Sequence, residues 1–109
     1  MTSYIQVMTA VNREEEAAHI AQQLVDQGLA ACVQVAGPVK STYRWKGAIE
    51  TTEEWQCFIK TEQRHWNSLV ELIKEIHPYE LPEIISMPIQ NGSREYLDWL
   101  GEQVKTRNK

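Results

Sequence analysis

The fold is decided by residues 30–60, which read AACVQVAGPVKSTYRWKGAIETTEEWQCFIK. The stretch is rich in Val, Ile, Thr, Tyr and Trp, residues that favour extended structure. Gly37-Pro38 interrupts its first half, most simply as a bulge or a kink, because proline cannot donate to a continuous ladder. The chain must then reverse, either at Lys46-Gly47 or around Thr51-Thr52. We favour the second position because it gives two long matched strands, and residues 55–60 then form the third strand of the chain.

A strand and a helix are predicted before this hairpin. Residues 4–10 are rich in strand-forming side chains. Asn12 is the expected N-cap of the helix, and residues 14–16 are glutamates, whose negative charge the helix dipole favours in a first turn. Gly28 is expected to end the helix. The apolar face of this helix recurs at helical spacing and comprises Ala17, Ile20, Ala21, Leu24 and Val25.

A helix, a strand and a last helix are predicted after the hairpin. Pro78 and Pro82 bracket a stiff loop over residues 77–82, and residues 83–89 are expected to form the fourth strand. Residues 91–93 are expected to turn and cap a terminal helix. The apolar face of the helix before this loop comprises Leu69, Leu72, Ile73 and Ile76. The apolar face of the terminal helix comprises Tyr96, Leu97, Leu100 and Val104. The order β-α-β-β-α-β predicts a ferredoxin-like α+β fold, an antiparallel sheet with helices on one face, in a single domain over residues 1–109.

Composition excludes several classes of protein. The net charge of -4 argues against a duplex nucleic-acid binder, which neutralises phosphates with Lys and Arg. No apolar run approaches the roughly 18 residues of a membrane span, and residues 1–4 lack the features of a signal peptide. Cys32 and Cys57 are the only cysteines, so we expect a cytoplasmic protein with reduced thiols, each acting as a small apolar side chain. The two lie on neighbouring predicted strands, yet a disulfide is not required.

Three aromatic side chains of the hairpin, Tyr43, Trp45 and Trp55, indicate self-association. The hairpin is long for a domain of this size, and an uncovered strand edge invites pairing with another chain. Aromatic residues are also enriched in buried interface cores. The alternative is that these rings lie on the covered face of the chain's own sheet.

Five segments in order resemble the CutA divalent-ion-tolerance family, and together they cover essentially the whole chain. The segments are Leu29-Ala30-Ala31-Cys32-Val33; Ser41, Tyr43, Trp45 and Gly47; Ile59-Lys60-Thr61; His77-Pro78-Tyr79-Glu80 with Pro82-Glu83; and Tyr96-Leu97-Asp98-Trp99-Leu100. The resemblance implies a ferredoxin-like fold, a tightly packed homotrimer similar to the PII signalling proteins, and a link to copper and other divalent cations. It implies no agreed molecular activity, and we expect no enzyme.

A copper site is expected only from the resemblance. Some bacterial relatives that bind copper use a cysteine on the first strand and a histidine pair before the Pro-Tyr dipeptide. The matching positions here are Met8, Ile76 and His77, so His77 is the candidate ligand and Met8 could add a thioether, which suits cuprous copper. The alternative is that Met8 fills the core. His19 and His65 are expected to be surface residues.

A second set of residues predicts either a pocket for a small ligand or an inter-subunit cluster. The set comprises Tyr43, Lys60, His77, Tyr79, Glu80, Glu83 and Trp99. A stiff loop that presents ionisable groups suits a recognition site, and Lys60 could hold an anionic ligand. Alternatively, Lys60 pairs with Glu80 or Glu83 across a subunit boundary, which we favour.

Two other classes of function are weighed against a binding module. An enzyme could use His77 and a glutamate as acid and base, but no recognisable catalytic arrangement supports this. An RNA-recognition module shares the β-α-β-β-α-β order, yet it needs exposed aromatics and basic surroundings, and this chain is acidic.

Overall fold

The computed structural model of the protein describes residues 3–104, which form one four-stranded sheet and three α-helices. In chain order the elements are β1 (Tyr4–Val11), α1 (Glu14–Asp26), β2 (Cys32–Trp45), β3 (Ala48–Glu62), the 3₁₀ helix η1 (Gln63–His65), α2 (Trp66–Ile76), β4 (Ile85–Pro88) and α3 (Arg94–Gln103). The strand order is β2-β3-β1-β4, and every neighbouring pair is antiparallel. The predicted ferredoxin-like α+β fold is therefore confirmed. In residues 3–104, no helix is long and apolar enough to cross a membrane.

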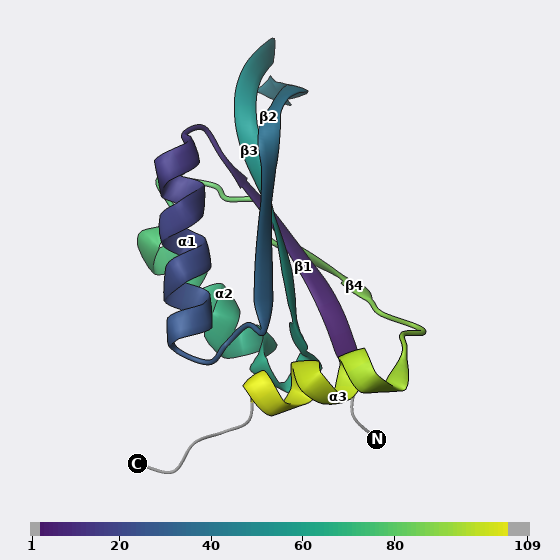
Figure 1. Cartoon of the computed structure of the whole chain (residues 1–109). Helices are drawn as coiled ribbons and strands as arrows, with labels where there is room; N and C mark the ends of the chain where they lie inside the picture. Colours follow the sequence, from purple (N-terminus) through teal and green to yellow (C-terminus); the bar gives the residue numbers. More distant parts are fainter. Residues whose placement is uncertain (1–2, 105–109) are drawn as a thin grey trace.

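The core lies between the sheet and two helices. Figure 1 shows α1 and α2 on one face of the sheet, while α3 crosses the end of the sheet away from the hairpin tip. Alternate residues of β1 point into this core, as the period of a strand requires. The buried core comprises Ile5, Val7, Val11, Ala17, Ile20, Leu24, Ala30, Cys57, Ile59, Leu69 and Ile73. Val25, predicted on the covered face of α1, is instead 45% exposed.

The reversal between β2 and β3 lies at Lys46-Gly47, so the prediction of Thr51-Thr52 is wrong. Trp45 pairs directly with Ala48, which leaves a two-residue turn. Lys46 and Gly47 have φ values of 50° and 83°, and positive φ at both positions is typical of a type I′ turn. This turn matches the twist of the flanking strands. The third strand consequently begins at Ala48, and Figure 1 shows the hairpin projecting beyond the helices.

The predicted bulge at Gly37-Pro38 is confirmed. The register shifts between Ala36 and Val39, where β2 carries one extra residue. Gly37 is required here because a Cβ atom would lie 2.6 Å from the ring of Trp55. Trp55 in turn packs against the core. The bulge therefore lets β2 pass over a large side chain of its partner strand.

The start of α1 and the extent of β4 differ from the prediction. The N-cap of α1 is Arg13, without a side-chain cap, and not Asn12; the glutamates of the first turn are as expected. The fourth strand is limited to Ile85–Pro88. By contrast, Ser93 caps α3 as expected, and its Oγ accepts a hydrogen bond from the Tyr96 backbone N–H at 3.3 Å.

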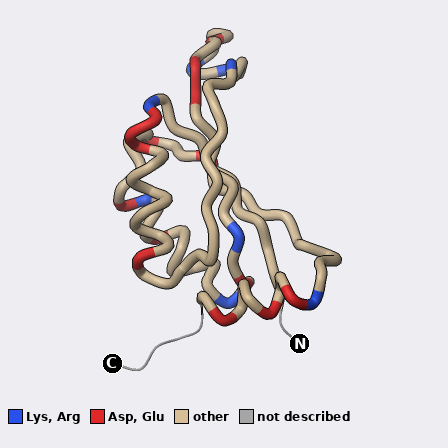
Figure 2. Tube along the Cα trace, viewed as in Figure 1, with Lys and Arg blue, Asp and Glu red and all other residues tan. Residues whose placement is uncertain are grey.

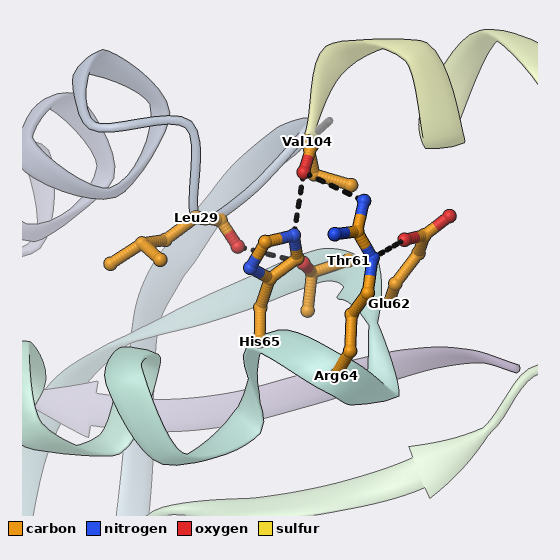
Figure 3. Close-up of polar contacts among 6 residues, drawn as sticks. All are labelled: Leu29, Thr61, Glu62, Arg64, His65 and Val104. Carbon is orange, nitrogen blue, oxygen red and sulfur yellow. Dashed lines mark hydrogen bonds and ion pairs between the residues drawn. The ribbon is translucent and has the colours of Figure 1, made fainter. Parts of the chain in front are cut away.

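The C-terminal helix is fastened to the rest of the chain by polar contacts around η1 (Figure 3). Arg64 pairs with Glu62 and also donates to the carbonyl oxygen of Val104 at 3.2 Å. The ring of His65 is hydrogen bonded to the same carbonyl and is only half exposed. The prediction that His65 is a simple surface residue is therefore wrong, because α3 folds back over it. His19 is exposed, as expected.

Candidate functional site

A cavity of about 780 Å³ lies along one side of the projecting hairpin. Three segments form its wall: the end of β1, the facing parts of β2 and β3, and the loop that follows α2. Its lining comprises Ala10, Asn12, Ser41, Thr42, Tyr43, Trp45, Glu50, Thr52, Glu54, Tyr79, Glu80, Leu81 and Glu83. Ligand sites in proteins fall in a similar range of volume, so this cavity is the leading candidate site.

The loop after α2 is held to the hairpin by a buried carboxylate. Glu54 is only 8% exposed, and its Oε2 accepts a hydrogen bond from the phenol of Tyr79 at 2.7 Å. Burial and this bond both raise the pKa of Tyr79. The phenol therefore keeps its proton and acts as a donor to the carboxylate.

His77 lies behind Tyr79 and supports the same loop. Its Nδ1 accepts a hydrogen bond from the Tyr79 backbone N–H at 3.1 Å, so the proton resides on Nε2, which donates to the carbonyl oxygen of Ala10 at 2.9 Å. The two rings also meet edge to face, with centroids 4.8 Å apart. Burial lowers the pKa of His77, outweighing the opposing effects of the Ala10 carbonyl and of Glu54 and Glu16. The neutral imidazole is therefore a structural link, and it does not line the cavity.

The fold brings some of the predicted site residues together and separates others. Tyr43, Tyr79, Glu80 and Glu83 all line the cavity, and His77 is one step behind it. The charge of the lining is strongly acidic: it contains four glutamates and, among residues 3–104, no Lys, Arg or His side chain contributes to it.

Lys60 and Trp99 lie elsewhere in the chain. Lys60 pairs in register with Gln6 and Cys32, and its Nζ donates to Oε1 of Gln34 at 2.7 Å. Trp99 is on α3, at the far end of the sheet from the hairpin tip (Figure 1). Within one chain, neither residue reaches the acidic cavity.

The proposed metal ligands do not converge in the described part of the chain. Both ring nitrogens of His77 are already hydrogen bonded, so neither offers a free lone pair to copper. Met8 lies half-buried in β1, in register with Phe58 and Ile85. Across residues 3–104, no three or more His, Cys, Asp or Glu side chains are grouped as a metal ion would require. These residues do not fit a resident copper centre.

The hairpin aromatics divide between two environments. Trp55 packs against the chain's own core, as the alternative interpretation expected. Tyr43 is 40% exposed and Trp45 is half exposed at the end of β2. Only these two rings remain available to a ligand or to a second copy.

Glu54 and Glu50 were missed from the sequence. Along β3, Cys57 and Ile59 point into the core, so alternation also places Trp55 inward and Glu54 outward, toward solvent. The loop at Tyr79, 25 residues further along, covers the carboxylate instead. No local sequence pattern predicts such a contact.

The fold and the cavity define the class: a ferredoxin-like α+β domain with a ligand-sized acidic cavity beside a projecting hairpin. Residues 5–103 match the family described as "CutA1 divalent ion tolerance protein". The chain is 44% identical to a divalent-cation tolerance protein CutA of Thermus thermophilus, over 88% of this chain and 93% of that protein. It spans only 49% of the human protein CutA, at 38% identity over 80% of this chain.

Solved structures agree with this assignment. A divalent cation tolerance protein (Cut A1) from Thermus thermophilus superimposes with a TM-score of 0.91 at 41% identity, over 94% of this chain and 99% of that one. CutA1 from Oryza sativa gives a TM-score of 0.93 at 32% identity, over 96% of each chain. The chain belongs to the CutA1 divalent ion tolerance family.

Proposed function

We propose that the protein is a homotrimeric, PII-like module that binds a small ligand in the response to divalent cations. The observation that carries this proposal is the cavity, because it has the volume of a ligand site and is built on rigid strands. Its position beside a projecting hairpin would couple an occupied site to the packing of neighbouring copies.

Surface features support self-association. The outer strands β2 and β4 each have an unpaired edge within residues 3–104, and such edges invite pairing. On β4, Ile85 and Met87 are 46% and 47% exposed, and Ile49 near the hairpin tip is 67% exposed. Exposed apolar side chains of this size are typical of an interface.

The chemistry of the lining supports binding without catalysis. The lining residues include no cysteine, lysine or histidine, so the hydroxyl groups of the lining have no imidazole or amine beside them to activate a nucleophile. His77, the base of the alternative enzyme hypothesis, is engaged with Ala10 and Tyr79 behind the wall. The cavity is therefore better suited to hold a ligand than to transform it.

The cytoplasm is the proposed compartment, since Cys32 and Cys57 are both free thiols in the structure and such thiols persist in reducing surroundings. Copper enters the proposal through the divalent-ion tolerance of the family. Because the described residues do not fit a resident metal centre, no step of the proposed function goes through one.

Two measurements test the proposal. Light scattering should give three times the chain mass of 12.6 kDa, even in dilute solution. Titration of the trimer with small metabolites, nucleotides, copper and zinc, side by side, should raise the melting temperature for at least one ligand, since binding at about 100 times Kd adds roughly 2.7 kcal/mol to stability. A monomer at micromolar concentration, or a trimer that no compound stabilises, would contradict the proposal.

A further inference from the structure

Among residues 3–104, the buried carboxylate of Glu54 has no positively charged partner. Its one hydrogen bond within the described residues comes from the neutral phenol of Tyr79, and the ion pairs of residues 3–104 do not include it. A carboxylate that is 8% exposed loses much of its hydration and is costly to bury without a compensating cation. Because Glu54 faces the cavity, the missing positive charge can enter from there.

The rest of the lining favours the same sign of charge. Glu50, Glu80 and Glu83 add three carboxylates around the cavity, with no basic side chain among the described lining residues. Figure 2 shows acidic positions on the hairpin and at the start of α1, and basic positions also lie on the hairpin near its tip. Clefts lined by one sign of charge concentrate ligands of the opposite sign, so this cavity attracts cations and repels phosphates.

Aromatic rings supply a second element of cation recognition. Tyr43, Trp45 and Tyr79 line the cavity, and the faces of such rings attract ammonium and guanidinium groups within about 6 Å. The Nζ of Lys46 already lies 5.6 Å from the ring centroid of Trp45, although Lys46 does not line the cavity. The face of the Trp45 ring therefore already attracts one cationic side chain.

The arrangement suits an organic cation better than a bare metal ion. Divalent ions need several oxygen, nitrogen or sulfur ligands at short fixed distances, and in residues 3–104 no such group occurs. The carboxylates are instead spread around about 780 Å³, between aromatic rings and the apolar side chain of Leu81. Spread carboxylates with apolar surface between them match ammonium groups carried on an aliphatic stem.

We propose that the cavity binds an aliphatic amine, with one ammonium group at Glu54 and its stem along Tyr43 and Trp45. This inference rests on the proposed function, in which the cavity is the ligand site. Further ammonium groups on the same stem would meet the more exposed Glu50 and whichever of Glu80 and Glu83 does not pair with Lys60 of a neighbouring copy. Linear di- and polyamines are therefore preferred over monoamines.

Calorimetric titration of the intact protein with spermidine, 1,4-diaminobutane and butylamine tests the inference. We expect affinity to fall in that order, and ATP to show no binding. Glu54→Gln keeps the shape of the side chain and the bond to Tyr79, so affinity for spermidine should fall roughly 10- to 100-fold, as expected for one charge-assisted hydrogen bond. The matched control is Glu53→Gln, an exposed neighbour outside the lining, which should bind spermidine like the parent.

Melting temperature and oligomer mass separate a ligand site from an interface. Neutralising an uncompensated buried charge should leave the free Glu54→Gln protein as stable as the parent, or more stable, with the same mass by light scattering. If Glu54→Gln instead lowers the mass and no amine binds, a basic residue of a neighbouring copy pairs with Glu54 and the inference is overturned.

The ligand panel also separates failure of the amine inference from failure of the proposed function. If only anions or nucleotides stabilise the protein, the amine inference fails while the proposed function stands. If the two glutamine variants lose affinity equally, the amines bind diffusely to an acidic surface, which overturns the inference. A protein that is monomeric and stabilised by no compound overturns the inference and the proposed function together.

Discussion

At the scale of single residues, Glu54, Tyr79 and His77 form one continuous unit. The carboxylate of Glu54 accepts a hydrogen bond from the hydroxyl group of Tyr79. The backbone N–H of Tyr79 donates to Nδ1 of His77, and Nε2 of His77 donates to the carbonyl oxygen of Ala10. Three elements that are far apart in sequence are thereby joined at the wall of the cavity. The unit requires a neutral imidazole, because a protonated Nδ1 could not accept from Tyr79.

Stability should consequently depend on pH through His77. Burial lowers the pKa of His77 in the folded state below its ordinary value of 6.5, so the unfolded chain binds more protons just below that pH. The free energy of unfolding therefore falls as the pH drops from 6.5 toward the folded-state pKa of His77. Above pH 6.5 the contribution of the neutral His77 to stability is complete. Urea unfolding between pH 8 and pH 5 should show this fall.

The control for this prediction is a second histidine. His77→Gln should flatten the dependence on pH, whereas His19→Gln, on the exposed face of α1, should leave it as in the parent. A profile that is the same in all three proteins would show that His77 does not titrate as its surroundings require.

At the scale of elements, the hairpin is set by its two-residue turn. Gly47 has φ of 83° and no atom within 4 Å of the position its Cβ would take. The glycine is therefore needed for its backbone conformation and not for space. Lys46, at φ of 50°, adopts a left-handed conformation that asparagine tolerates better.

Gly47→Ala should destabilise the protein by roughly 1–2 kcal/mol, the cost of a left-handed residue that carries a Cβ. Lys46→Asn should leave stability unchanged or raise it, because the new side chain suits the type I′ turn. Urea unfolding at one fixed protein concentration measures both. If Gly47→Ala were as stable as the parent, the turn would have to adopt another geometry in solution.

At the scale of the whole molecule, substitution of Lys60 tests whether this residue forms an ion pair with a neighbouring copy of the chain. Within one chain its Nζ bonds only to Gln34 among the described residues, and loss of that bond alone should cost about 1 kcal/mol. If Lys60 also pairs with Glu80 or Glu83 of a neighbouring copy, Lys60→Met strands a carboxylate, and breaking a buried pair costs about 3–5 kcal/mol.

We expect Lys60→Met to lower the melting temperature or split the proposed trimer, and to do so more than the control Gln34→Ala, which removes only the internal bond. A double-mutant cycle with Glu80→Gln or Glu83→Gln should show strong coupling for the true partner. If Lys60→Met and Gln34→Ala have equal, small effects on the melting temperature and neither changes the oligomer mass, Lys60 has no inter-subunit role.

The sequence by itself determined the order of elements, the long hairpin, its bulge at Gly37-Pro38 and the Ser93 cap. These features depend on local signals: strand-forming runs, helical spacing of apolar residues, and the backbone limits of glycine and proline. It also carried the family resemblance, because the five motifs keep their order along the chain. The reversal was misplaced at Thr51-Thr52 because that position was expected to give two long matched strands. The pairing of Trp45 with Ala48 shows that a turn at Lys46-Gly47 gives them instead.

Only the tertiary structure decided the composition of the cavity. Glu54 is buried by Tyr79 from a loop 25 residues away, and His65 is covered by α3, 39 residues away. The tertiary structure also places Lys60 and Trp99 away from the loop residues with which the sequence analysis had grouped them. Contacts between distant segments depend on how the sheet and the helices pack. This packing does not produce a regular spacing of residues in the sequences of the segments that it joins. The acidic character of the cavity, on which its ligand chemistry depends, is therefore a property of the folded chain.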